Sequence, residues 1–482
     1  MSKDLSSAPH VLLFPCPVQG HINPLLKLTE LLCIAGLHVT FVTTNQMCAR
    51  LLEHSDLRAR FAPYPGFRIE SVSDGLQPTD PIRTSSVENQ IDLFRSLNSI
   101  TRPLFQEMLA SGTLTSGNRP PVTCIIADGF LDFVADIAQD FKIPLFAFHV
   151  LSVATIWSML CFPDLLESGL IPFQGENDER IKCLEGFDGV LRIKDMSEHD
   201  EMSPIYVAAI LKSQEAVGTI FNSFEDLEGR FLSLVRTKCP TTYAVGPLHT
   251  HLNNRLYNRS NGQSLNSGSI YSEDRSCIPW LDTQRDRSTV YVSFGSLAVL
   301  KKEEFLELWY GLAQSGKSFL WVMRSGLVEG ESSWGDQLPP ELIEKAEGRG
   351  YIVGWAPQEE VLVHPAVGSF LTHGGWNSIV ETIVAGLPMI CWPYFAEQYL
   401  NSRCVSELYK FGVYLKDYPC HRDAISRTVN EVMNRRQDGL LASAKLMAER
   451  SKKAVNEGGS SYNDLNQLLD HIQSLSHQST AK

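Results

Sequence analysis

Residues 367–386 combine a short apolar run, a glycine-rich turn and the start of a helix. The run VGSFLT (367–372) is long enough for a buried strand, the turn HGG (373–375) follows it, and residues 376–386 show the apolar period of a helix. Glycine lets the backbone approach an anion closely, and a helix N-terminus offers free N–H groups and a positive dipole end. The segment therefore predicts a phosphate site. The side chains that can add donors to it are His373, Asn377 and Ser378.

Other polar and aromatic groups around this turn suit the remaining parts of a nucleotide sugar. Glu381 lies four residues after Asn377, on the same helix face but one turn deeper, where a carboxylate can accept from ribose hydroxyls. Trp355 offers a flat face for a base. Glu397 and Gln398 supply a carboxylate and an amide that can accept from and donate to sugar hydroxyls.

An HGG turn alone also occurs in ordinary strand–turn–helix units, so it is a weak signal. The whole stretch 355–398, from WAPQ to FAEQ, resembles the signature box of the plant family 1 UDP-sugar glycosyltransferases. The resemblance extends over almost the whole chain. It implies a GT-B type α/β fold, with two Rossmann-like domains that face each other across a cleft. It also implies inverting transfer of glucose from UDP-glucose to a hydroxyl or carboxyl group of a small lipophilic plant metabolite.

A histidine and an aspartate follow two different predicted strands of the first domain. His21 comes after the strand 10–16 and before a helix that Asn23 would cap, with Pro24 at its first position. The dipole of that helix favours the neutral imidazole. Asp128 ends the strand 124–128, so the two side chains can meet above one sheet edge, where a carboxylate would fix the imidazole tautomer.

A lone histidine in a turn is more often structural, so the spacing alone leaves this dyad open. The segments PVQGHINP and IIADGF resemble those that hold the catalytic residues of the family. The resemblance implies that His21 deprotonates the acceptor and that Asp128 orients His21.

The resemblance also assigns the donor. It implies uracil on Trp355 beside Ala356 and Gln358, ribose on Glu381, and glucose against Trp376, Glu397 and Gln398. For the diphosphate it implies Gly20, Ser296, His373, Gly375, Asn377 and Ser378. Relatives that use galactose often have His at the last box position, so Gln398 implies glucose. The chain has no Asp-x-Asp pair, and we expect neither a metal nor another cofactor.

The acceptor side is less clear from the sequence. Many relatives have an aromatic residue followed by Thr, a frequent sugar contact, where this chain has His149 and Val150. Ser152 is one candidate to replace that contact, and His149 is either a sugar contact or a core residue. Aromatic residues that can line an apolar pocket, or simply fill the core, are Phe130, Phe133, Phe148, Trp157 and Phe395. The stretch 64–76 resembles plant glucosyltransferases of iridoids such as 7-deoxyloganetic acid, while other terpenoids, flavonoids and other phenolics remain open as acceptors.

Length and composition agree with a globular two-domain protein. A chain of 482 residues is too long for a single hydrophobic core. Its net charge of −13 argues against binding of nucleic acid and against a polybasic membrane anchor. Eleven scattered cysteines, with no C-x-x-C pair and no signal peptide, favour a cytoplasmic protein with reduced thiols. The apolar run 143–162 contains Pro and His, and we interpret it as a strand and helix rather than a membrane span.

We expect a monomer divided into an N-terminal acceptor domain (1–248), a linker rich in Asn, Ser and Gly (249–277), a C-terminal UDP-sugar domain (278–459) and a final helix (460–482) that packs back on the first domain. Short apolar runs predict further strands at 37–43, 145–148, 217–221, 243–245, 290–294, 319–323 and 351–353.

Four other functions are alternatives to a glycosyltransferase. A catalytically silent protein on the same fold would bind a lipophilic ligand, but it would not need His21 and Asp128. A sugar-nucleotide epimerase would use the same two domains, although the signature box does not favour it. The chain has no G-x-S-x-G elbow for a hydrolase, and no G-x-G-x-x-G follows either opening strand, as a dehydrogenase would require.

Overall fold

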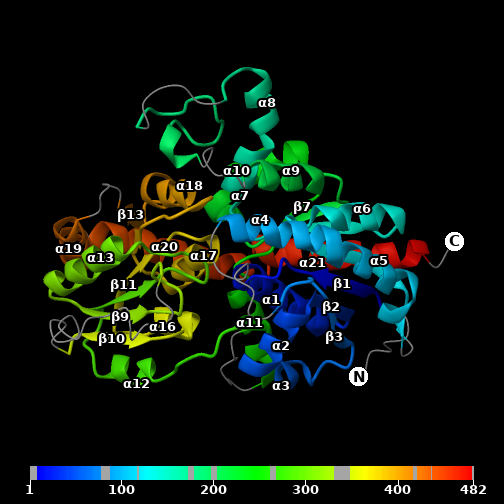
Figure 1. Cartoon of the computed structure of the whole chain (residues 1–482), viewed down its shortest axis with the longest axis horizontal. Helices are drawn as coiled ribbons and strands as arrows, with labels where there is room; N and C mark the ends of the chain where they lie inside the picture. The colour runs from blue at the N-terminus through cyan, green and yellow to red at the C-terminus, as the bar shows by residue number, and fades with distance from the viewer. Residues whose placement is uncertain are drawn as a thin grey trace.

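The computed structural model describes residues 8–77, 87–116, 119–171, 178–196, 203–260, 268–330, 348–415, 421–435 and 437–479. These residues form two α/β lobes, each built on a parallel sheet, as the GT-B prediction requires (Figure 1). No helix among them is long and apolar enough to cross a membrane. The run 143–162 forms a strand followed by a helix, as predicted.

The N-terminal lobe contains seven parallel strands in the order β3-β2-β1-β4-β5-β6-β7. Their bounds are β1 (His10–Phe14), β2 (His38–Thr44), β3 (Phe67–Val72), β4 (Val122–Asp128), β5 (Leu145–His149), β6 (Gly218–Phe221) and β7 (Thr242–Ala244). The central strand β1 lies between β2 and β4, with Leu12 opposite Thr40 on one side and Ile125 on the other. The strand order reverses at β1, and the gap between β1 and β4 is the position where such sheets bind ligands.

Helices cover both faces of this sheet, as the Rossmann-like pattern requires. Their bounds are α1 (Gln19–Ala35), α2 (Asn45–His54), α3 (Leu57–Phe61), α4 (Val87–Ser96), α5 (Arg102–Ala110), α6 (Asp132–Asp140), α7 (Val153–Leu160), α8 (Phe162–Glu167), α9 (Ser203–Ser213), α10 (Glu225–Lys238) and α11 (Leu248–Ser260).

The C-terminal lobe contains six parallel strands in the order β10-β9-β8-β11-β12-β13. Its strands are β8 (Thr289–Ser293), β9 (Ser318–Val322), β10 (Gly350–Val353), β11 (Val367–Thr372), β12 (Met389–Cys391) and β13 (Gly412–Tyr414). Its helices are α12 (Cys277–Asp282), α13 (Lys302–Ser315), α16 (Gln358–Val363), α17 (Trp376–Ala385), α18 (Gln398–Arg403), α19 (Arg422–Asn430) and α20 (Gln437–Val455). Here the order reverses at β8, so the ligand position lies between β8 and β11.

Two local predictions differ from the structure. Helix α1 begins at Gln19, so Asn23 does not cap it and Pro24 lies inside it. The local capping signal was overridden by a contact with the other lobe, described below. The expected irregular linker 249–277 begins with helix α11, which packs on α1, and residues 261–267 lie outside the described part.

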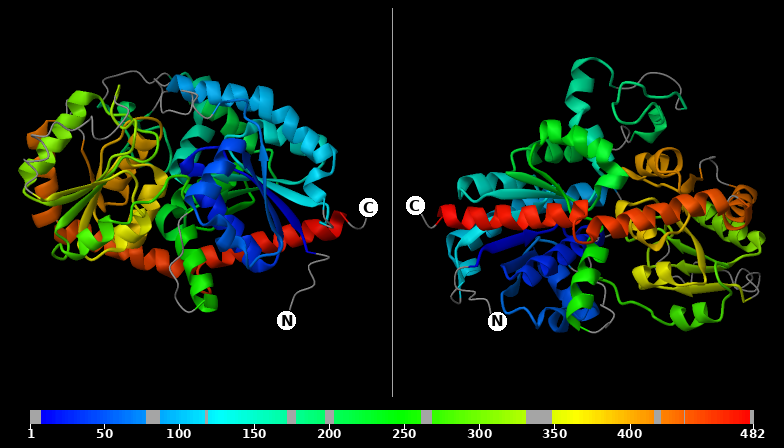
Figure 2. Two further views of the ribbon diagram at one scale, coloured as in Figure 1. Left: turned by 60° about the horizontal axis from the view of Figure 1, so that its bottom comes forward. Right: turned by 180° about the vertical axis from the view of Figure 1, so that it is seen from behind.

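The last helix, α21 (Ser460–Ser479), runs back along the N-terminal lobe (Figure 2). The Asp464 carboxylate accepts from the backbone N–H of Ala244 at 2.7 Å, and the Tyr243 hydroxyl lies 2.9 Å from His471 Nδ1. The C-terminus therefore joins the second lobe to the edge strand of the first.

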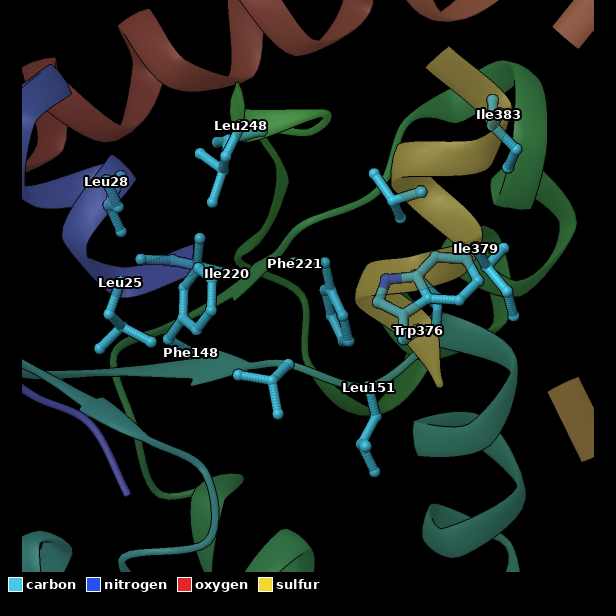
Figure 3. Packing of buried hydrophobic residues seen from close by; sticks show 14 of the residues in the cluster. Leu25, Leu28, Phe148, Leu151, Ile220, Phe221, Leu248, Trp376, Ile379 and Ile383 are labelled. Atoms are coloured by element: carbon cyan, nitrogen blue, oxygen red, sulfur yellow. The ribbon is translucent and has the colours of Figure 1, made fainter. Parts of the chain in front are cut away.

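An apolar core continues across the boundary between the lobes. Trp376, at the start of α17, packs with Leu151 and Phe221 of the N-terminal lobe (Figure 3). Its indole N–H donates to the carbonyl of Asn222 at 3.0 Å, and the residue is only 2% exposed. The first turn of α17 is therefore held by the opposite lobe.

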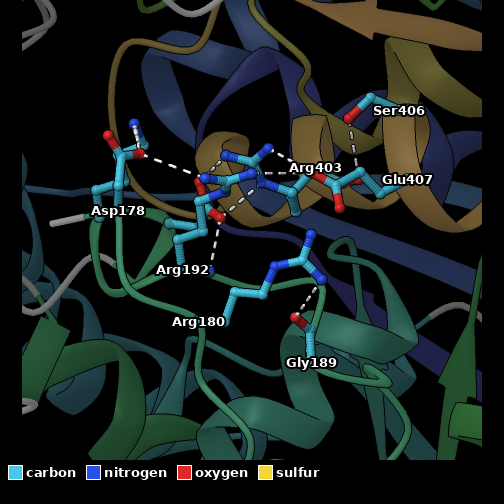
Figure 4. A network of polar contacts seen from close by, with 9 residues as sticks. Asp178, Arg180, Gly189, Arg192, Arg403, Ser406 and Glu407 are labelled. Atoms are coloured by element: carbon cyan, nitrogen blue, oxygen red, sulfur yellow. Dashed lines mark hydrogen bonds and ion pairs between the residues drawn. The ribbon is translucent and has the colours of Figure 1, made fainter.

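Ion pairs join the segment 178–196 to α18 (Figure 4). Arg403 donates to both carboxylate oxygens of Asp195, Nε to Oδ2 at 2.7 Å and Nη2 to Oδ1 at 3.1 Å. Both side chains are almost fully buried, and Asp195 also accepts from the backbone N–H of Arg192. The remaining guanidinium nitrogen of Arg403 reaches Glu407 at 2.8 Å.

Removing one member of this buried pair should be far more costly than removing both charges. We expect Arg403→Met to lower the free energy of unfolding by about 3–5 kcal/mol, because Asp195 is then buried without a cation. The double variant Asp195→Asn/Arg403→Met should recover most of this loss. Urea denaturation followed by circular dichroism measures both, and equal losses in the single and double variants would contradict the prediction.

Candidate active site

One cavity lies where the ligand positions of the two sheets face each other. On the N-terminal side it is lined by the segment after β1, including Gly20 and His21, and by Phe130 after β4. On the C-terminal side it is lined by Ser293 at the end of β8, by Gly295 and Ser296 after it, and by the turn after β11. Each residue predicted for the donor lines this cavity: Gly20, Ser296, Trp355, Ala356, Gln358, His373, Gly375, Trp376, Asn377, Ser378, Glu381, Glu397 and Gln398.

His21 and Asp128 form a hydrogen-bonded pair at the N-terminal wall. His21 Nδ1 lies 2.6 Å from Asp128 Oδ2, and His21 lines the cavity while Asp128 is 2% exposed behind it. Backbone N–H groups of Phe130 and Cys16 donate to the Asp128 carboxylate at 3.0 and 3.4 Å. The carboxylate is therefore immobilised, and Nδ1 of His21 is occupied, which leaves Nε2 for a ligand.

A missing hydrogen bond in α1 connects this wall to the glycine turn. In a regular helix the carbonyl of Gly20 would accept from the N–H of residue 24, but Pro24 has none. The carbonyl instead accepts from Asn377 Nδ2 of α17 at 2.6 Å. This contact between the lobes explains why a helix that contains an internal proline remains intact and begins at Gln19, five residues before the first helical position, Pro24, that the capping signal predicts.

The turn itself requires glycine. Gly374 has φ of +83°, and a Cβ on Gly375 would come 2.5 Å from His373 Nε2. Burial lowers the pKa of His373 to about 4, so its imidazole is neutral at pH 7. The turn thus offers neutral donors and the N-terminus of α17, and no lysine or arginine appears among the described residues of the cavity wall.

The base and ribose end is an aromatic stack beside a polar cluster. Trp355 lines the cavity and stacks on Tyr271, with ring centroids 4.3 Å apart. Gln358 accepts from the Tyr291 hydroxyl at 3.2 Å and donates to Glu381 Oε2 at 2.6 Å. Burial, with the nearby carboxylate of Glu359 adding to it, raises the pKa of Glu381 to about 7.

The end of the predicted box holds two polar groups with fixed roles. The carbonyl oxygen of Gln398 accepts from the backbone N–H groups of Tyr394 and Phe395 at 2.9 and 3.3 Å. Gln398 therefore offers a ligand only its N–H groups, not the donor and acceptor predicted from its type. Glu397 supplies the neighbouring carboxyl group, and burial raises its pKa to about 7.

The opposite end of the cavity is apolar and aromatic. Its rings form a series from His21 to Phe130 (5.6 Å between centroids) and from Phe130 to Tyr206 (4.8 Å). The Tyr206 hydroxyl donates to Gln90 Oε1 at 2.6 Å. Other side chains of this wall are Cys16, Val18, Leu93, Phe94, Val150, Leu151, Met159 and Phe395.

Several candidates for the acceptor pocket do not line the cavity. For them the alternative that they fill the core holds. Phe148 and Phe133 fill the core, and the Trp157 indole N–H donates to the carbonyl of Glu185. His149 is 3% exposed, lies against Gly129, and does not line the cavity. Burial lowers its pKa to about 4, so it is a neutral core residue.

Ser152 does not line the cavity either. Its hydroxyl caps α7 by accepting from Thr155 N at 3.1 Å, and it lies 2.9 Å from Asn401 Oδ1. Asn401 in turn donates to the carbonyl of Gly374 at 3.2 Å. Of the predicted acceptor residues, only Phe130 and Phe395 reach the cavity.

Sequence reasoning missed the residues that α4 and α9 bring to the cavity, namely Gln90, Leu93, Phe94 and Tyr206. These helices follow segments without a motif, and only the tertiary arrangement places them opposite His21. It also missed Tyr271 behind Trp355. Among the described residues, no group of three or more His, Cys, Asp and Glu side chains is arranged to hold a metal ion.

Comparisons with known proteins agree with this geometry. Residues 272–437 match the sequence model of the family described as UDP-glucoronosyl and UDP-glucosyl transferase. The chain is 47% identical to the 7-deoxyloganetic acid glucosyltransferase of Catharanthus roseus over 98% of its own length and 99% of that protein. It is 40% identical to the myricetin 3-O-rhamnoside 1,2-glucosyltransferase of Crocosmia x crocosmiiflora, covering 97% and 96%.

Among solved structures, the Os79 protein of O. sativa in complex with UDP superimposes with a TM-score of 0.75. The two proteins are 27% identical, and the match covers 96% of this chain and 100% of that one. With near-complete coverage of relatives at 40–47% identity, the chain belongs to the plant family 1 UDP-glycosyltransferases and is a UDP-glucosyltransferase of small plant metabolites.

Proposed function

We propose that His21 is the general base of an inverting glucosyl transfer and that Asp128 holds it in position. The observation that carries this proposal is the 2.6 Å contact between His21 Nδ1 and Asp128 Oδ2 at the point where the two halves of the cavity meet. His21 Nε2 takes the proton of the acceptor hydroxyl, and the oxygen attacks the anomeric carbon from the face opposite UDP. The bond from that carbon to the diphosphate breaks, and the product is a β-glucoside. The neighbouring carboxylate of Asp128 stabilises the imidazolium that forms.

The leaving UDP is proposed to bind along the C-terminal wall. Uracil stacks on the free face of Trp355 beside Ala356 and Gln358, and ribose hydroxyls donate to Glu381. The diphosphate meets the start of α17, where its free N–H groups and dipole favour an anion. Its other contacts are Gly20, Ser296, His373, Gly375, Asn377 and Ser378.

Replacing the base should separate chemistry from donor binding. We expect His21→Ala to lower kcat by ~10²–10⁴-fold while the Kd for UDP stays within about twofold, because the proposed UDP contacts lie on the other wall, except for Gly20, which the substitution leaves unchanged. His364, which is outside the cavity and pairs with Asp282, gives the matched control His364→Ala. Activity of His21→Ala within threefold of the unmodified enzyme would remove His21 from the mechanism.

The proposed acceptor is a small, mainly apolar alcohol, with an iridoid acid such as 7-deoxyloganetic acid as the first candidate. The apolar wall of Val150, Leu151, Met159 and Phe94 supports an apolar body, and the Tyr206–Gln90 pair supports one polar substituent distant from the reacting hydroxyl. The relative at 47% identity, named for 7-deoxyloganetic acid, favours the iridoid, and the one at 40%, named for a flavonoid glycoside, keeps flavonoids as the alternative.

The assay for this proposal is incubation with UDP-glucose and a panel of iridoid, flavonoid and phenolic aglycones, followed by mass spectrometry. The expected product has the mass of the aglycone plus one hexose.

We also propose that the reaction needs no metal ion or other cofactor. Support comes from the diphosphate wall, where a helix N-terminus and the neutral donors of His373, Asn377 and Ser378 converge. The expected result is an unchanged initial rate with millimolar EDTA. A loss of activity that magnesium or manganese restores would contradict this.

Glu381, the proposed ribose contact, should lower the stability of the ligand-free enzyme at alkaline pH. The folded chain holds the proton of Glu381 up to about pH 7, whereas the unfolded chain loses it near pH 4.5, so stability falls as the pH rises through this interval. We expect Glu381→Gln to raise the Tm of the ligand-free protein by about 2–4 °C at pH 8 and to leave it unchanged at pH 4.5. The same variant should weaken UDP binding about tenfold, through loss of a charged acceptor. A Tm difference that shrinks from pH 4.5 to pH 8 would oppose the prediction.

Donor choice is proposed to depend on Gln398 and Glu397 together. UDP-glucose and UDP-galactose differ only in the direction of the 4-hydroxyl, so selection requires polar groups that pair with one arrangement. With its carbonyl already used, Gln398 donates to the sugar and Glu397 accepts from it. A buried unpaired group costs about 1–3 kcal/mol, which corresponds to roughly tenfold to hundredfold preference.

We therefore expect kcat/KM for UDP-glucose to exceed that for UDP-galactose by at least tenfold, and Gln398→His to reduce this ratio. Both donors are measured with one acceptor. Equal use of both by the unmodified enzyme would disprove the preference, and an unchanged ratio in the variant would remove Gln398 from its explanation.

We propose that the enzyme is a monomer and is cytoplasmic. The cysteines in the described part of the chain are all free thiols, which supports a reducing compartment.

A further inference from the structure

Arg324 is a buried cation beside the diphosphate wall. It lies two residues after β9 and is 9% exposed. Its guanidinium donates to three backbone carbonyls: Nε to Gly295 at 3.1 Å, Nη1 to Ser325 at 3.0 Å, and Nη2 to Ala298. Two of these carbonyls belong to the segment 295–298, which follows β8 and carries the cavity residue Ser296.

No carboxylate in the described part of the chain forms an ion pair with Arg324. Burying a charge without an opposite charge is costly, and carbonyl dipoles compensate it only in part. An unpaired guanidinium that folding nevertheless retains therefore points to an anion that arrives later.

The position of Arg324 identifies that anion. Gly295, whose carbonyl Arg324 binds, has φ of +67°, and a Cβ there would come 2.8 Å from His373 Cε1. The imidazole of His373 therefore lies directly against Gly295. Arg324 donates a hydrogen bond to the carbonyl of the same Gly295. The positive charge of Arg324 acts on His373, whose ring is neutral at pH 7. The described cavity wall itself contains no arginine and no lysine, so the charge of Arg324 acts from behind the wall.

We infer that Arg324 is a positioning residue for the leaving diphosphate: it fixes the segment 295–298 so that Ser296 faces the phosphates, and its charge stabilises UDP as it departs. The inference rests on the proposed place of the diphosphate. When the bond from the anomeric carbon to oxygen breaks, the electron pair stays on the β-phosphate, which gains one negative charge. A fixed cation one residue behind the wall favours that state over bound UDP-glucose.

Two comparisons separate the effect of the charge of Arg324 on ligand affinity from the effect of its shape. The first compares UDP with uridine, and the second compares Arg324→Gln with Arg324→Lys. In Arg324→Gln we expect the Kd for UDP to rise about tenfold or more, while the Kd for uridine, which lacks phosphate, stays within about twofold. Arg324→Lys keeps the charge, so its ratio of UDP to uridine affinity should stay within about threefold of the unmodified ratio. The value of kcat should fall more than KM for UDP-glucose rises in Arg324→Gln. Isothermal titration calorimetry and steady-state rates measure these quantities.

Arg422→Gln is the matched control, because it makes the same change in net charge in the same lobe at a residue that pairs with Glu307 outside the cavity wall. It should change neither affinity. Thermal melts show whether each variant is folded, and if Arg324→Gln is not, Arg324→Met, which keeps the aliphatic part of the side chain without the charge, replaces it with the same expected results.

Equal weakening of uridine and UDP in Arg324→Gln, or loss of the UDP-to-uridine ratio in Arg324→Lys, would overturn the inference and leave Arg324 a purely structural residue. Failure of the proposed diphosphate site itself would be visible in the unmodified enzyme. It would then bind UDP no more tightly than uridine, whatever the Arg324 variants do.

Discussion

The active site depends on how helix α17 is held. Its N-terminus must face the cavity without protein partners on its first N–H groups, while its body must not move. Both requirements are met because the first turn of α17 is held through the side chain of Trp376. The Trp376 indole is buried against Leu151 and Phe221 of the opposite lobe and donates to the Asn222 carbonyl, so the anion-binding end of one domain is supported by the core of the other.

The proline in α1 has a related role. By removing one N–H from the helix, Pro24 leaves the carbonyl of Gly20 available at the wall of the proposed diphosphate site, and Asn377 donates to that carbonyl. A local defect in one helix thus becomes a contact between two domains. It places the segment with His21 and the turn with His373 on opposite sides of one narrow space, where acceptor and donor have to meet.

Much of this arrangement could be predicted from short segments. The run 367–386 folds as the strand, turn and helix that its pattern indicated, and His21 and Asp128 meet because both follow strands beside the reversal of strand order. Signals that depend on distant partners failed. Asn23 and Pro24 look like a cap because the bond from Asn377 is invisible locally, and Ser152 and His149 have polar side chains whose partners, Asn401 and Ser213, come from remote helices. For the same reason the aromatic wall of α4 and α9 had no sequence signature.

The bridge from Ser152 through Asn401 to Gly374 has a consequence for how such enzymes diverge. One amide binds both the loop that shapes the acceptor end and the turn that shapes the donor end. The two halves are therefore not independent modules. A recombinant that joins the first half of one relative to the second half of another inherits this bridge only if both parents carry compatible side chains at its two ends. Exchange of acceptor range between lineages is then limited by a contact that touches no substrate.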